Sequence, residues 1–170
     1  MNNIIFVTVR FIILIVLQVF VCNYIHLFGF INPNIYLLAL LLLPFETPKS
    51  LQYLIAFTSG FLIDMFAMTY GVNASAALLL IFVRPYLVKL LNGRRTTEGT
   101  DKPTPSTKDL KWMLIYTFVL VFIYQLMAYM LELFSFRHFL KSMGIVLINT
   151  LFTSFVILCI EYILIPVKKK

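Results

Sequence analysis

The sequence has few charged residues: 12% of its 170 residues are Asp, Glu, Lys or Arg, and only seven are acidic. In an ordinary soluble domain about a quarter of the residues are charged. Hydrophobic residues make up 61% of the chain, and its mean hydropathy is +0.95. A soluble domain of this length has too small an interior to bury so much apolar surface. The composition therefore excludes a soluble globular protein and indicates an all-α integral membrane protein.

Cysteine and histidine are scarce as well, with two residues of each. Neither His26 nor His138 belongs to a group of three or more Cys, His or acidic residues at the spacing of metal ligands. The helix arrangement predicted below places Cys22 and Cys159 near opposite faces of the membrane, which makes a disulfide between them implausible. The sequence shows no Gly-rich phosphate loop and no serine nucleophile with a local base. We therefore expect no metal, no cofactor and no enzymatic activity.

Long apolar runs separated by short breaks predict six transmembrane helices in one domain, residues 1–170. About 20 apolar residues suffice to cross a bilayer. The predicted helices cover about residues 4–28, 33–45, 50–68, 72–91, 110–134 and 142–166. The second is short because Pro33 and Pro44 bound it, and Pro85 is expected to kink the fourth. Residues 92–109 form a polar linker, too rich in Gly, Pro, Ser, Thr and charge to fold by itself.

The basic residues are distributed unevenly over this topology. Six helices place both termini on one side of the membrane, and 12 of the 14 Lys and Arg residues fall on that side. The positive-inside rule then places both termini in the cytoplasm. The basic residues flank apolar segments, so the net charge of +7 does not indicate nucleic-acid binding. They are expected to attract anionic membrane lipids, and Arg84 and Lys89 are assigned to an interfacial extension of the fourth helix.

Residues 51–91 form a predicted hairpin around which the other helices are organised. Gly60 and Asp64 lie four residues apart, so they share a helix face, and Gly60 allows a neighbouring backbone to approach closely. The turn contains Gly71, and Asn73 is the expected N-cap of the next helix, which continues with small residues from Ala74. These five residues are the candidates for a structural or partner-interaction site.

Asp64 itself has two interpretations. In the structural one, its carboxylate accepts hydrogen bonds from the turn or from the N-terminus of the next helix, where the helix dipole favours an anion. In the functional one, it contacts a partner or a bound solute, because a carboxylate in an apolar segment is costly and marks a site. The two interpretations are compatible where the capped turn shapes a partner-binding surface.

Other polar residues lie in or beside the predicted spans. Three are expected to hydrogen-bond between helices, singly or as one cluster: Gln18, Gln125 and Asn149. Glu132 lies close in sequence to Arg137 and His138, and a water-exposed ion pair is preferred there over a proton site. Glu161 is expected near the cytoplasmic end of the last helix, where it meets water or basic residues.

The segments Gly60–Asp64 and Gly71–Ala74, which read GFLID and GVNA, resemble the G-x-x-x-D … G-x-x-A signature of the MreD family of bacterial rod shape-determining membrane proteins. The resemblance extends to size, the six helices, the short proline-bounded second helix and the basic loop after the fourth. It implies a non-enzymatic scaffold of the cell-elongation machinery in the bacterial inner membrane. The implied partners are an MreC-like protein, the MreB filament system and the peptidoglycan synthases.

The MreD family also resembles in fold the S components of energy-coupling-factor vitamin transporters, which are compact six-helix bundles. The alternative function is therefore a small-molecule binding subunit of a membrane transporter. S components dock their energising partner through small residues on the first helix, often in an A-x-x-x-A pattern. Here the first helix reads FIILIVLQVFVCNYIHLF and contains no such pair. That departure weighs against the transport function.

Overall fold

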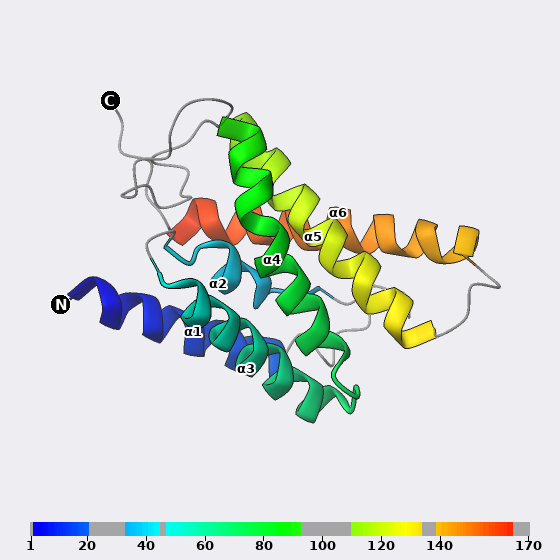
Figure 1. Cartoon of the computed structure of the whole chain (residues 1–170), viewed down its shortest axis with the longest axis horizontal. Helices are drawn as coiled ribbons and strands as arrows, with labels where there is room; N and C mark the ends of the chain where they lie inside the picture. The colour runs from blue at the N-terminus through cyan, green and yellow to red at the C-terminus, as the bar shows by residue number, and fades with distance from the viewer. Residues whose placement is uncertain (1, 21–32, 45–46, 93–109, 134–138, 165–170) are drawn as a thin grey trace.

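The computed structural model describes residues 2–20, 33–44, 47–92, 110–133 and 139–164, and in these ranges the chain is helical apart from turns. The helices are α1 (Asn2–Phe20), α2 (Leu37–Leu41), α3 (Lys49–Ala67), α4 (Val72–Asn92), α5 (Leu110–Leu133) and α6 (Phe139–Leu164) (Figure 1). Four of them, α3 to α6, are long and apolar enough to cross a membrane, and α1 contains a shorter apolar stretch. The protein is therefore a multi-pass membrane protein.

The longer helices follow the sequence prediction closely. The ends of α3 and α4 lie within one residue of the predicted bounds, and α5 begins where predicted. The start of α6 differs, because this helix begins at Phe139, three residues before the predicted residue 142. The predicted first helix is described only as far as Phe20. Its remainder, with Cys22 and His26, lies outside the described residues, as do His138 and the linker at 93–109.

The predicted second helix, residues 33–45, is wrong in its bounds: α2 has five residues. At about 1.5 Å per residue it is only about 8 Å long, far less than a bilayer core of about 30 Å. The chain enters it through a turn in which the Leu37 and Leu38 N–H groups donate to the Asn34 and Ile35 carbonyls, three residues earlier. Non-helical backbone at membrane depth is tolerated where protein surrounds it. Every residue from Tyr36 to Leu43 is buried, with at most 5% of its surface exposed.

The long helices are apolar outside and partly polar inside, the reverse of a soluble helix. The clearest case is α6. Its large exposed side chains, among those described, are Leu147, Ile148, Leu151, Phe155, Tyr162 and Ile163, and its buried face includes Asn149, Thr150, Thr153, Ser154 and Glu161. Polar side chains in membrane helices face the bundle interior, because lipid cannot satisfy them. This pattern is what a lipid-facing exterior requires, and it agrees with the assignment to a membrane.

Consecutive long helices pack against each other in the order α3, α4, α5 and α6, and α1 packs on α2 and α3. The start of α1, the end of α4, the start of α5 and the end of α6 lie toward one end of the bundle (Figure 1). The α3–α4 turn, the end of α5 and the start of α6 lie toward the other. This arrangement agrees with the predicted order of crossings. The side of the membrane on which each end lies stays a prediction.

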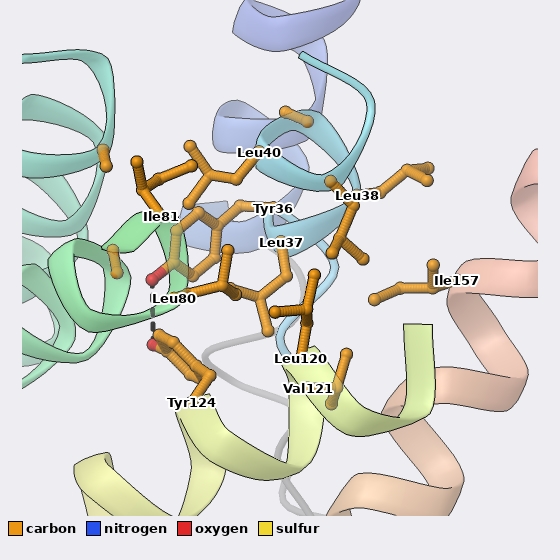
Figure 2. Close-up of a cluster of buried hydrophobic side chains, with 14 of the residues drawn as sticks. Tyr36, Leu37, Leu38, Leu40, Leu80, Ile81, Leu120, Val121, Tyr124 and Ile157 are labelled. Carbon is orange, nitrogen blue, oxygen red and sulfur yellow. Dashed lines mark hydrogen bonds between the residues drawn. The ribbon is translucent and has the colours of Figure 1, made fainter. Parts of the chain in front are cut away.

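The buried segment 36–43 is the centre of the core (Figure 2). Side chains from three surrounding helices lie around it: Leu80 and Ile81 of α4, Leu120, Val121 and Tyr124 of α5, and Ile157 of α6. Each of these six residues is at most 2% exposed. Because the segment contacts its surroundings on all sides, its path is fixed by tertiary packing and not by its own periodicity.

Candidate functional site

The backbones of α3 and α4 approach most closely at Gly60. A Cβ atom placed on Gly60 would lie 2.5 Å from Ala74 Cα and 2.7 Å from both Ala74 N and Asn73 O. No side chain larger than hydrogen fits that space without a backbone shift. The close approach expected at Gly60 is therefore present, and its partner is the first turn of α4.

The Asp64 carboxylate lies one turn along α3 from Gly60 and hydrogen-bonds to the same first turn of α4. Its Oδ1 accepts from the Asn73 backbone N–H at 3.0 Å and from Asn73 Nδ2 at 2.9 Å, and its Oδ2 accepts from the Ala74 backbone N–H at 2.9 Å. The Thr69 hydroxyl also donates to Oδ1. The first N–H groups of a helix have no partner within it, and the positive end of the helix dipole favours an anion there. Asp64 is only 4% exposed, and the structure has the hydrogen bonds that its structural interpretation requires.

The turn between α3 and α4 contains two residues with left-handed backbone. Met68 ends α3 at φ 55°, and its N–H donates to the Asp64 carbonyl. Gly71 has φ +79°, a conformation that residues with a side chain rarely adopt. The Gly71 carbonyl accepts the first bond of α4, from the Ser75 N–H at 3.0 Å. Asn73 is thus not the N-cap that the sequence predicted, because α4 begins one residue earlier, at Val72.

Asn73 instead links the turn to the core. Its Nδ2 donates to Asp64 and to the Thr69 hydroxyl at 3.0 Å, and its Oδ1 accepts from the Tyr124 hydroxyl of α5. Tyr124 in turn accepts from the Tyr36 hydroxyl at 2.8 Å, the bond drawn in Figure 2. The two rings meet edge-on with their centroids 6.0 Å apart. One hydrogen-bonded chain therefore connects α3, α4 and α5 to the buried segment before α2. We call Gly60, Asp64, Thr69, Gly71, Asn73 and Ala74 the α3–α4 joint.

A second polar cluster holds the other end of the buried segment, and its centre is Arg84 of α4. Arg84 Nε donates to the Tyr116 hydroxyl of α5 at 2.8 Å, and Nη1 donates to Gln52 Oε1 of α3 at 3.4 Å. Nη2 donates to the carbonyls of Leu41, at 3.2 Å, and of Leu43. Tyr116 also donates to the Leu41 carbonyl, at 3.1 Å. These bonds satisfy the carbonyls at the C-terminal end of α2, which have no helical partner.

The assignment of Arg84 to an interfacial extension was wrong, because the residue is only 1% exposed. Helix α4 continues through Pro85 to Asn92, so Arg84 lies about two turns before its end. The position of Arg84 within an apolar run was the one feature of the sequence that indicated its burial. Arg84 was counted with the flanking basic residues, and removing it changes the predicted 12-to-2 distribution of basic charge to 11 to 2 (12 − 1 = 11).

The N-terminal end of the segment is held by α1. Gln18 Oε1 accepts from the Ile35 N–H at 2.7 Å and from the Tyr36 N–H at 3.4 Å. Gln18 was expected to bond between helices, and it does so through backbone groups that sequence alone could not select. Gln125 of α5 donates to the Thr153 hydroxyl of α6 at 3.5 Å. Arg137 and His138, the predicted partners of Glu132, lie outside the described residues.

The five predicted site residues therefore come together in the α3–α4 joint, while the Arg84 cluster was missed. The joint is a hydrogen-bonded structural contact. In the part of the chain that the structure describes, no group of three or more His, Cys, Asp or Glu side chains is placed to hold a metal ion. No protein-family model, curated protein or solved structure matches the chain.

Proposed function

We propose that this protein is a non-enzymatic scaffold of the bacterial cell-elongation machinery, as the resemblance of its GFLID and GVNA segments to the MreD signature implies. The observation that supports the proposal is the place of the signature residues. Gly60 admits the α4 backbone, Asp64 accepts from two N–H groups of α4, and Gly71 has the positive φ of the turn. Each defining residue thus has a physical role at one joint, which favours a shared architecture over a chance match of common residues.

A scaffold needs a rigid body with side chains free to contact partners, and the joint offers both. Its interior is closely packed and hydrogen-bonded, whereas Met68 and Tyr70 in its turn are 87% and 101% exposed. The predicted topology places this turn on the periplasmic side, where we propose that it contacts an MreC-like protein or a peptidoglycan synthase. The basic cytoplasmic segments are the proposed side for the MreB system. The protein is then a multi-pass component of the inner membrane.

The alternative, a small-molecule binding subunit of a transporter, has one observation in its favour. An open pocket of about 410 Å³ lies beside the α3–α4 turn, and its lining includes Thr69, Gly71, Ser75, Leu131 and Glu132. Ligand pockets commonly have volumes of about 300–1,000 Å³. The pocket is therefore large enough for a small molecule such as a vitamin. Identification of the proteins and small molecules that co-purify separates the two functions.

The test is purification of the tagged full-length protein in mild detergent, followed by identification of the proteins that remain bound. The proposal expects an MreC-like protein or peptidoglycan synthases. Tyr70→Ala should lower their recovery without lowering the amount of the protein in the membrane. Tyr86→Ala is the matched control, since Tyr86 is also exposed, at 64%, but lies in the second half of α4. Recovery of an ATPase module together with a bound small molecule would favour the transport function and overturn the scaffold.

A further inference from the structure

Glu161 is a buried carboxyl group that neither the joint nor the Arg84 cluster uses. It lies on the buried face of α6 and is only 1% exposed. Neither of its oxygens has a hydrogen-bond partner among the described residues. Asp64 is almost as buried, but both of its oxygens accept backbone N–H groups. The expectation that Glu161 meets water or basic residues is therefore wrong as regards water.

Helix α5, which packs on α6, contains another buried polar group without a hydrogen-bond partner among the described residues. The two helices run in opposite directions and cross obliquely (Figure 1), and the Gln125–Thr153 hydrogen bond links them. Residues at i, i+4 and i+8 form a continuous ridge on a helix. Eight residues from this bond along each ridge lie Thr117 (125 − 8) and Glu161 (153 + 8). The Thr117 hydroxyl is buried and has no hydrogen-bond partner in the described part of the chain either.

Among the described residues, titratable groups of two other helices, α1 and α5, interact electrostatically with Glu161. Arg10 of α1 interacts with it electrostatically, without a hydrogen bond. Tyr116 of α5 interacts electrostatically with Glu161 and also with Arg84 of α4. The Tyr116 hydroxyl and Arg84 are already engaged with the Leu41 carbonyl, and Arg84 also binds the Leu43 carbonyl. Arg10 is only partly buried.

We propose that Glu161 is a proton-binding site in the α5–α6 interface and is protonated in the folded bundle. A buried carboxylate without hydrogen bonds or a bonded cation is so costly that such a group neutralises instead. The proton comes from water at the nearby end of α6. The neutral group lies one turn from buried, apolar Ile157 on the same face of α6 and leaves no unpaired charge there. Loss of the proton would place an anion in this interface and draw Arg10 toward it.

The test is labelling of the full-length protein in detergent with the apolar reagent dicyclohexylcarbodiimide, followed by peptide mass spectrometry. A protonated carboxyl gives its proton to one nitrogen of the reagent, and its oxygen bonds to the central carbon. The adduct rearranges to an N-acylurea, so the whole reagent is added and nothing leaves. We expect one adduct on Glu161, with a yield that falls as the pH is raised. Asp64 is the internal control and should stay unlabelled, because both of its oxygens are already occupied by N–H and hydroxyl donors of the turn and of α4.

Two variants complete the test. Glu161→Gln is nearly isosteric and should lose the adduct from that peptide. Arg10→Gln removes a positive charge that favours the ionised form of Glu161. In this variant the labelling of Glu161 at a given pH should therefore increase. Three outcomes overturn the proposal: no adduct on Glu161 at any pH at which the protein stays folded, equal labelling of Asp64 and Glu161, or labelling of Glu161 that appears only in Arg10→Gln. The last outcome would mean that Glu161 and Arg10 form an ion pair.

Discussion

Asp64 and Arg84, two buried side chains of opposite charge type, belong to the polar clusters on either side of the buried segment. They differ in how far along the chain their hydrogen-bond partners lie. Asp64 accepts from N–H groups nine and ten residues away. Arg84 donates to carbonyls 41 and 43 residues away. Truncating either side chain leaves backbone groups unpaired inside the bundle, at a cost of about 1–3 kcal/mol for each group.

The first prediction concerns Asp64. Asp64→Leu removes both acceptors of the α4 N–H groups and should lower the stability of the purified protein by about 1–3 kcal/mol for each donor left unpaired. Asp64→Asn keeps one acceptor oxygen and should cost less. Thermal unfolding in detergent measures both. A loss in Asp64→Asn as large as in Asp64→Leu would show that the negative charge, and not its oxygen atoms, is required.

The second prediction concerns Arg84. Arg84→Met retains an apolar stem but leaves the Leu43 carbonyl unpaired and the Leu41 carbonyl with Tyr116 alone, so it should lower the amount of folded protein in the membrane. Tyr116→Phe is the matched control, because Arg84 still reaches both carbonyls, and it should cost only about 1 kcal/mol. Equal behaviour of the two variants in a detergent stability assay would contradict the role assigned to the guanidinium.

The elements differ in how well the sequence predicts them. Helices α3, α4 and α5 are long apolar runs between breaks, so hydropathy alone placed their ends well. The contact of α3 with α4 was also accessible, because a glycine and a carboxylate on one face precede a nearby turn. The bounds of helix α2 were not accessible, since the backbone before it bonds to Gln18 and the backbone at its end bonds to Arg84, both distant in sequence. Contacts between residues so far apart produce no local sequence pattern. For the same reason the sequence did not predict the hydrogen bonds of Arg84.

The third prediction tests the helix contact at Gly60. In Gly60→Ala the added Cβ would lie 2.5 Å from Ala74 Cα, so α3 and α4 must move apart. The variant should unfold at a lower temperature and, through the shifted Asp64 bonds, lose protein from the membrane. Gly144→Ala in α6 is the control, because nothing lies within 4 Å of its added Cβ. Its replacement should be neutral or stabilising by up to about 1 kcal/mol. The same response in both would refute the close contact.

At the scale of the whole molecule, the bundle presents an apolar exterior and a mainly apolar core that contains polar clusters and is crossed by one buried segment. The fold as a membrane bundle follows from composition and pattern. The orientation rests on basic residues, of which 11 remain on the terminus side once Arg84 is assigned to the interior. The function rests on the resemblance and on the physical roles of its signature residues at the joint.

The fourth prediction is the orientation. Reporter fusions at Thr97 and Lys170 should report a cytoplasmic location, and a fusion at Gly71 a periplasmic one, because the basic residues remain in the cytoplasm. The fusions serve as controls for one another, since the predicted topology places Thr97 and Lys170 on the same side of the membrane and Gly71 on the opposite side. A periplasmic signal at Thr97 would rule out the orientation.

The central claim, a scaffold of cell elongation, is tested most directly by cell width after depletion of the protein in a rod-shaped bacterium that carries no second copy. The account predicts cells that become wide or round and then lyse. Expression of the wild-type protein should restore the rod, and Gly144→Ala should restore it equally, whereas Asp64→Leu should not. Unchanged cell width after verified loss of the protein would contradict the account.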